Sequence, residues 1–161
     1  MKAMINHPIP PFYDAHSQIL ILGSFPSVKS REQVFFYGHP QNRFWRVISA
    51  IFGKNVPVTI EEKRELLLNN GIAVWDVIAS CDIVGSSDIS IRNAVPNDLS
   101  MILNNSKIEK IFVNGKTAEK YYNKYLKEKL GMEAICLPST SPANATYSFE
   151  DLVKAWGQIK I

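Results

Sequence analysis

The sequence has few residues that could build a metal centre or a disulfide framework. Its 161 residues include two cysteines and three histidines. Cys81 and Cys136 stand alone, without the paired spacing of a zinc site, and the histidines at positions 7, 16 and 39 are scattered. We therefore expect no metal site, and a reducing, cytoplasmic setting for a chain with isolated thiols.

Long apolar runs and strong net charge are also absent. The longest apolar runs, such as residues 19–22, are short, whereas a membrane helix needs about 20 apolar residues. The proline-rich residues 1–11 have no hydrophobic centre of the signal-peptide kind. Eighteen Lys and Arg against fifteen Asp and Glu leave a net charge of +3, which permits a nucleic-acid partner without requiring one. With 46% hydrophobic residues, the composition predicts one soluble globular domain over residues 1–161.

Apolar segments alternate with helical patterns along the chain. Short apolar segments predict buried strands over residues 17–22, 72–78, 110–115 and 133–138. Periodic patterns and capping residues predict helices over residues 42–52, 60–69, 117–130 and 149–159, with another ending near residue 104. Residues 82–97 are polar and predict turns. The alternation predicts an α/β sandwich with a short parallel sheet.

Three polar loops follow predicted strands, at residues 23–30, 114–117 and 138–146. In a parallel sheet these loops share one edge and converge on one pocket, which the aromatic stretch 35–45 also approaches. No Gly-x-Ser-x-Gly sequence is present, which argues against a small-molecule α/β hydrolase.

Several residues of these loops have a structural and a functional interpretation. Tyr37 either packs in the core or stacks on a base, and a stacking role predicts that Tyr37→Phe is nearly silent. Asn42 caps a helix, holds a water or a base edge, or does both. Asn114 is a turn residue before Gly115, or it uses its donor and acceptor to read a base. Residues 139–145 form a plain loop or one that approaches a phosphate backbone closely.

The order of these motifs resembles that of the uracil-DNA glycosylase superfamily over about residues 19–158. The motifs are Gly23-Ser24-Phe25-Pro26-Ser27, His39-Pro40-Gln41-Asn42-Arg43-Phe44-Trp45, Asn114-Gly115-Lys116-Thr117-Ala118 and Leu137-Pro138-Ser139-Thr140-Ser141-Pro142-Ala143-Asn144-Ala145. Within the superfamily they are most similar to the hypoxanthine-DNA glycosylases, and next to the mismatch-specific uracil and thymine glycosylases. The resemblance implies a three-layer α/β/α sandwich around a mainly parallel four-stranded sheet.

The resemblance also implies roles for the motif residues. Gly23, Ser24, Phe25 and Pro26 correspond to the water-activating loop, and Asn114 to the base-reading position. Further substrate contacts correspond to the stacking aromatic, to its neighbouring histidine and to the loop that enters the minor groove, namely Tyr37, His39, Ser139, Thr140, Ser141 and Asn144. The first motif lacks the Asp or Asn of many relatives, and the last lacks a His. Both features favour the hypoxanthine branch and move the catalytic amide to Asn42.

The expected activity is hydrolysis of the N-glycosidic bond of a flipped, deaminated base, hypoxanthine in preference, without a cofactor. No lysine of the motifs is placed as a Schiff-base nucleophile, so a monofunctional enzyme is expected, with Lys116 meeting a phosphate. The expected partner is DNA with a damaged base; no membrane and no obligate protein partner is expected, and the protein is predicted to be a monomer. A uracil or mismatch-specific uracil glycosylase remains an alternative. A non-catalytic nucleic-acid-binding module is another, supported by the missing first-motif acid.

Overall fold

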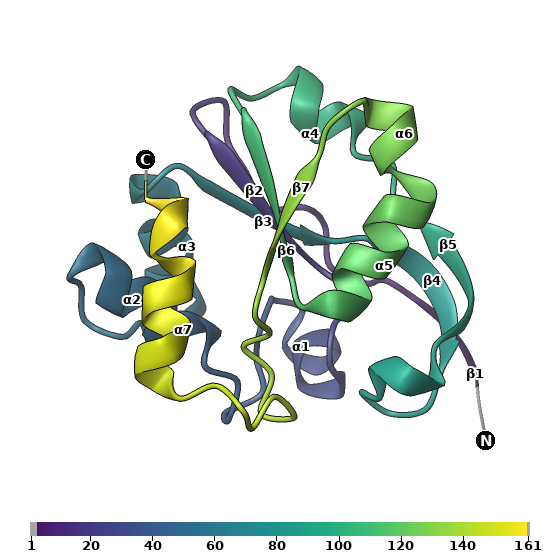
Figure 1. Cartoon of the computed structure of the whole chain (residues 1–161), viewed down its shortest axis with the longest axis horizontal. Helices are drawn as coiled ribbons and strands as arrows, with labels where there is room; N and C mark the ends of the chain where they lie inside the picture. The colour runs from purple at the N-terminus through teal and green to yellow at the C-terminus, as the bar shows by residue number, and fades with distance from the viewer. Residues whose placement is uncertain (1–2, 161) are drawn as a thin grey trace.

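The computed structural model describes residues 3–160 and is built around a four-stranded parallel sheet (Figure 1). Its strands are β2 (Ile19–Gly23), β3 (Ile72–Asp76), β6 (Lys110–Asn114) and β7 (Ala134–Leu137), in the order β3-β2-β6-β7. All five residues of β2 are buried, because this central strand is covered on both faces. A continuous apolar run is typical of such a strand, and the prediction of a parallel four-stranded sheet is confirmed.

Helices cover both faces of this sheet (Figure 1). One face carries α2 (Phe44–Phe52), α3 (Ile60–Asn69) and α7 (Phe149–Trp156), the last continuing into the 3-10 turn η2 (Gly157–Ile159). The other carries α4 (Ser100–Asn104), α5 (Lys116–Tyr125) and α6 (Lys127–Leu130). Phe44 and Trp156 belong to the core on the first face and Tyr122 to the core on the second. The expected α/β/α layering is therefore present.

The helix boundaries follow the predicted caps with differences at three helices, and the predicted loop 23–30 is wrong at its end, where helix α1 (Val28–Gln33) begins. Thr59 and Glu62 form the predicted capping box of α3. Helix α2 begins at Phe44 rather than at residue 42, because Arg43 is its N-cap residue and Asn42 stands one position earlier, where its side chain accepts from Phe44 N. The predicted helix 117–130 begins at Lys116 and is divided at Leu126 into α5 and α6, and the predicted helix 149–159 finishes as η2.

A second sheet was not predicted from the sequence. It is antiparallel, with the order β1-β4-β5, and comprises β1 (Ala3–Asn6), β4 (Ile78–Ile83) and β5 (Arg92–Pro96). The predicted strand 72–78 is wrong in its extent, since Val77 separates β3 from β4. The turn prediction for residues 82–97 is also wrong, because they include β5 and the 3-10 turn η1 (Asp88–Ser90). None of the five residues of β5 is buried, so this edge strand has no apolar run to reveal it.

The N-terminal segment connects the two sheets and ends against β3. His7 N donates to Ala79 O across 2.7 Å, and Phe12 pairs with Val74 of β3. The Trp75 indole N–H donates to Ile9 O across 2.9 Å. These bonds hold residue 7 next to the carboxyl end of β3. Among residues 3–160, no helix is long and apolar enough to cross a bilayer.

Candidate active site

The ends of the parallel strands open into one cavity of about 300 Å³. Gly23 ends β2, Asp76 ends β3 and Asn114 ends β6, and all three line the cavity. The remaining wall comes from the loop after β2, the segment before α2 and the loop between β7 and α7. From these three segments the predicted site residues in the wall are Ser24, Phe25, Pro26, Tyr37, His39, Asn42, Ser139, Thr140 and Ser141. The convergence expected from parallel topology is therefore present.

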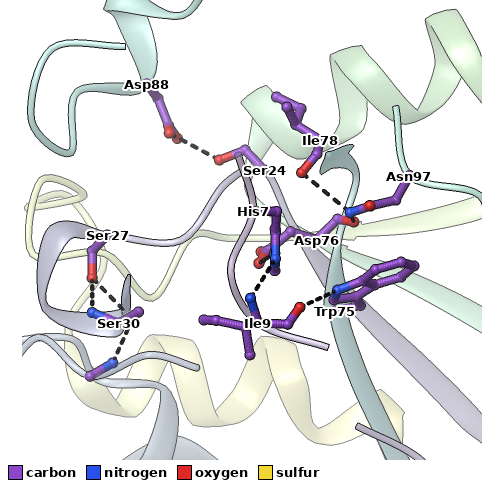
Figure 2. Close-up of polar contacts among 11 residues, drawn as sticks. His7, Ile9, Ser24, Ser27, Ser30, Trp75, Asp76, Ile78, Asp88 and Asn97 are labelled. Carbon is purple, nitrogen blue, oxygen red and sulfur yellow. Dashed lines mark hydrogen bonds and ion pairs between the residues drawn. The ribbon is translucent and has the colours of Figure 1, made fainter. Parts of the chain in front are cut away.

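The loop after β2 receives a carboxylate from a distant part of the chain. Ser24 Oγ donates to Asp88 Oδ1 across 2.9 Å, as Figure 2 shows. Asp88 is exposed as a residue, but this bond turns its carboxyl group toward the loop. Burial of that group, together with the charge of Asp76, raises the pKa of Asp88 above its usual value. Ser27 meanwhile caps helix α1 (Val28–Gln33) by accepting from Ser30 N across 3.1 Å. The first motif contains no acidic residue, but the fold places the Asp88 carboxyl group beside it.

Tyr37 is held in a strained and partly covered position. Its φ of 52° lies in the left-handed region, which non-glycine residues seldom occupy. Its ring stacks on Phe44 with centroids 3.9 Å apart, and its carbonyl accepts from the Trp45 indole N–H across 3.1 Å. The Tyr37 hydroxyl is buried and has no hydrogen-bond partner of good geometry among the described residues, although the Asn114 side chain is close enough to lower its pKa in part. Burial, together with the charge of Asp76, raises the pKa of Tyr37 far above its usual value.

The two asparagines of the motifs are both engaged by backbone groups. Asn42 Oδ1 accepts from Phe44 N, the first residue of α2, across 2.9 Å, whereas the N-cap residue itself is Arg43, which makes no side-chain cap hydrogen bond. Asn114 Nδ2 donates to Thr140 Oγ1 across 3.0 Å, and Asn114 Oδ1 accepts from Thr140 N across 3.1 Å. The predicted N-cap position of Asn42 is therefore wrong by one residue, but its side chain still bonds the start of α2 and also lines the cavity. Asn114 joins β6 to the loop after β7.

The loop after β7 is tied down by its own side chains and by Arg43. Asn144 Nδ2 donates to Ser139 O across 3.0 Å, and the Arg43 guanidinium donates to the carbonyls of Asn144 and Tyr147. Asn144 lies outside the cavity of about 300 Å³ and lines a neighbouring hollow of about 580 Å³. Lys116 lines that second hollow too, beside Thr117 and Ser141.

Sequence reasoning missed three residues at this edge: Asp76, Asp88 and His7. Asp76 stands inside an apolar run that we interpreted as one strand, although a polar residue at the carboxyl end of a parallel strand is a signal for a site. Its side chain is 5% exposed and accepts from His7 Nε2 across 2.8 Å (Figure 2). No sequence signal links Asp76 to His7, because 69 positions separate them. Within residues 3–160, no three His, Cys, Asp or Glu side chains cluster as metal ligands.

Comparison with known proteins gives consistent matches over nearly the whole chain. The family described as the uracil DNA glycosylase superfamily matches residues 10–160. A hypoxanthine DNA glycosylase of Methanosarcina acetivorans is 36% identical over 147 residues, covering 90% of this chain and 92% of the relative. A protein of the same name from Methanosarcina barkeri is 32% identical over 137 residues, covering 84% and 85%.

One solved structure gives the corresponding comparison in three dimensions. It is a solution NMR structure of a Methanosarcina acetivorans protein named "putative Uracil DNA glycosylase". The two folds superpose with a TM-score of 0.80 at 31% identity, covering 99% of this chain and 100% of the other. The family match, the two relatives and this fold agree with the motif order and with the cavity that those motifs line. The chain therefore belongs to the uracil DNA glycosylase superfamily.

Proposed function

We propose that this protein is a monofunctional DNA glycosylase that flips hypoxanthine out of DNA and hydrolyses its N-glycosidic bond, leaving an abasic site. The observation that carries the proposal is the convergence of Tyr37, Asn42 and Asn114, from separate segments, on one cavity. Two relatives that are at least 32% identical are named hypoxanthine DNA glycosylase, which favours hypoxanthine as the substrate. Their presence within the same superfamily also argues against a non-catalytic binding module.

Cleavage of the glycosidic bond places positive charge on the sugar and negative charge on the departing base. Asp76 and Asp88 bring two carboxyl groups to the cavity wall, and the ionised form of Asp88 lowers the energy of a nearby sugar cation. Hypoxanthine pairs weakly, so its extrusion from the duplex costs less than that of a normal base. Because the protein supplies electrostatics and position, the reaction needs no covalent intermediate.

The attacking water is best held by Asn42. Its amide oxygen already accepts from Phe44 N, but a carbonyl oxygen has two lone pairs and can accept a second hydrogen bond from water. The bond to Phe44 N fixes the amide in one orientation, so the water is held in one position. Positioning of this kind contributes several kcal/mol to catalysis without requiring Asn42 to act as a base.

DNA contacts are assigned to the loops around the cavity. The loop between β7 and α7 presents Ser139, Ser141 and Asn144 at the protein surface, and Lys116 lines the hollow beside it. Small hydroxyl and amide side chains allow close approach to a phosphate backbone, which Lys116 would neutralise. We further propose that the protein works as a monomer in the cytoplasm and needs no protein partner or cofactor for base excision.

A side-by-side excision assay tests the proposal. Duplexes that carry hypoxanthine, uracil or xanthine at one position are incubated with excess protein, and abasic-site formation is followed in a single turnover. We expect hypoxanthine to be excised fastest. Faster excision of uracil would favour the second candidate, a uracil DNA glycosylase, which the name of the solved relative supports. Excision of none of the three bases would contradict both.

A further inference from the structure

Two oxygen atoms without hydrogen-bond partners lie beside Gly23 at the floor of the cavity. A methyl group on Gly23 would overlap Asp76 Oδ1 and would lie 3.2 Å from Tyr37 Oη. Glycine at this position therefore leaves room for both oxygens around one point of the floor. Among residues 3–160, neither Asp76 Oδ1 nor Tyr37 Oη has a hydrogen-bond partner.

A hydrogen bond from His7 holds the Asp76 carboxylate in place. Ile9 N donates to His7 Nδ1 across 3.2 Å, so Nδ1 carries no proton and the proton of the neutral ring is on Nε2. His7 Nε2 then donates to Asp76 Oδ2 across 2.8 Å, as Figure 2 shows. Both side chains are nearly inaccessible, at 3% and 5% exposure. The pair leaves Oδ1 as an acceptor on the cavity side, held in a fixed direction.

The Tyr37 hydroxyl supplies a donor beside this acceptor. A buried hydroxyl without a partner is costly, so a ligand that accepts its hydrogen bond is favoured at this position. Burial and the Asp76 charge raise the pKa of Tyr37, which favours the protonated form of the hydroxyl, the form that donates a hydrogen bond. Tyr37 and Asp76 both line the cavity, so a base that occupies the cavity lies against both residues.

We propose that Tyr37 O–H and Asp76 Oδ1 together read the edge of the flipped base that carries a carbonyl next to a ring N–H. This inference rests on the proposed function and names how its pocket recognises a deaminated base. Tyr37 donates to the carbonyl oxygen, and Asp76 accepts the ring N–H. Hypoxanthine and uracil both present that edge. Adenine presents the opposite one, an amine donor beside a ring nitrogen lone pair, and faces a clash at both positions.

Asp76 acts in this scheme as a specificity residue and His7 as a positioning residue. A carboxylate that accepts a hydrogen bond from the base does not favour negative charge on that base as it departs. The contact therefore selects the base more than it accelerates cleavage. Guanine shares the same edge, so it is excluded by its stable pairing with cytosine and by its additional amine, which this pair of atoms does not contact.

The test compares two bases that differ at this edge. Single-turnover excision is measured on duplexes with deoxyinosine and with deoxynebularine, whose purine base has no carbonyl and a lone pair at N1. In Asp76→Asn, the amide oxygen takes the His7 proton and the NH₂ group faces the base, opposing N1–H. We expect the hypoxanthine-to-purine rate ratio to fall at least about tenfold in Asp76→Asn. A stacking role alone would leave Tyr37→Phe nearly silent, whereas a hydroxyl that donates to the base predicts that it slows hypoxanthine excision at least about fivefold while purine excision stays within about twofold.

Matched variants separate recognition from folding. Asp82→Asn and Tyr125→Phe change the same side-chain types at positions that do not line the cavity, and should leave the ratio unchanged. His7→Ala should lower the ratio, and His7→Gln, which can still donate to Asp76, should restore much of it. The ratio compares the rates of the same variant on two substrates, so a smaller folded fraction lowers both rates equally and leaves the ratio unchanged. If Asp76→Asn does not fold, the results for Tyr37→Phe, His7→Ala and His7→Gln test the inference in its place.

The outcomes distinguish this inference from the proposed function. Wild-type excision of hypoxanthine with an unchanged ratio in the Asp76 and Tyr37 variants would overturn the inference and leave the function standing. Wild-type excision of uracil alone would overturn the preference for hypoxanthine, and the same variants would then be compared on uracil and cytosine. If wild type excises neither base, the proposed function fails and the inference fails with it.

Discussion

Asn114 and Thr140 exchange two hydrogen bonds across the site, one from Asn114 Nδ2 to Thr140 Oγ1 and one from Thr140 N to Asn114 Oδ1. The strand-end amide is therefore oriented by the loop between β7 and α7. Ser139 also packs against Gly115, where a methyl group would come within 3.0 Å of its Cβ. The loop proposed to contact DNA and the amide proposed to contact the base are coupled mechanically.

Removing the Thr140 hydroxyl tests this coupling. Thr140→Val keeps the shape of a fully buried side chain and leaves Asn114 Nδ2 without its partner. We expect single-turnover excision of hypoxanthine to fall about tenfold, and the free energy of unfolding to fall by about 1 kcal/mol. Thr140→Ser restores the hydroxyl and should recover most of the rate. Equal rates in the Val variant and wild type would show that Asn114 needs no orientation from the loop.

Arg43 offers a second test, because its guanidinium holds the same loop through two carbonyls, those of Asn144 and Tyr147. A lysine at this position has a single charged centre and cannot reproduce the forked geometry. In Arg43→Lys we expect faster hydrogen exchange at residues 141–147 and DNA binding weakened about three- to tenfold. Arg46→Lys, on the exposed side of α2, is the control and should change neither. Unaltered exchange in Arg43→Lys would contradict a bracing role.

The raised pKa of Asp88 predicts how stability depends on pH. Burial and the Asp76 charge favour the protonated form of Asp88 in the folded protein. The folded state then holds this proton more tightly than the unfolded state. The stability that this tighter proton binding adds is fully present below the ordinary carboxyl pKa of about 4. It is lost as pH rises through the higher pKa that Asp88 has in the folded protein. Asp88→Asn should therefore have a higher Tm than wild type at pH 7, with a smaller difference near pH 4. A constant difference across that range would contradict this assignment.

Phosphate contacts predict a salt-dependent interaction with DNA. The proposed contacts come from Lys116 and from the polar loop between β7 and α7, and cation–phosphate contacts release counterions. We expect the logarithm of the binding constant to decrease linearly with the logarithm of salt concentration between about 50 and 200 mM. Lys116→Gln should reduce the slope by about one. A flat dependence would show that binding does not use phosphate contacts.

The sequence predicted the parallel sheet well because its strands carry their signal locally. The Ile19–Gly23 segment is apolar throughout, and in the structure every one of its residues is buried. The second sheet carries no such signal, since β5 is an edge strand with exposed residues. The apolar run 72–78 also concealed a boundary, because Val77 joins two strands that belong to different sheets.

The candidate site was predictable where a motif supplied it and not where distant segments meet. All but one of the predicted site residues line the cavity, the exception being Asn144 in the adjoining hollow. The two carboxylates were missed because their neighbours are remote in sequence. Asp88 reaches Ser24 across 64 positions, and Asp76 meets a histidine from the N-terminal segment. Pairings of that kind follow from the topology of both sheets, which no local pattern encodes.

Asn42 lines the cavity, and its amide oxygen accepts from Phe44 N at the start of α2. Asn42→Ala removes both functions, and we expect single-turnover excision of hypoxanthine to fall at least tenfold, about 1.4 kcal/mol of transition-state stabilisation. The lost cap alone should lower the free energy of unfolding by about 1 kcal/mol. Asn42→Asp separates the two effects, because Asp caps a helix as well as Asn does.

If Asn42 holds the water, Asn42→Asp melts like wild type and binds DNA, but its rate or pH profile changes, because a carboxylate now contacts the water. If Asn42 only caps the helix, Asn42→Ala melts earlier yet excises at the wild-type rate below its melting temperature, and Asn42→Asp is indistinguishable from wild type. In that case the water would have to be held by the loop that follows β2. The Ser24 hydroxyl of that loop donates to Asp88. In that case Asp88→Asn would slow excision, whereas Asn42→Ala would not.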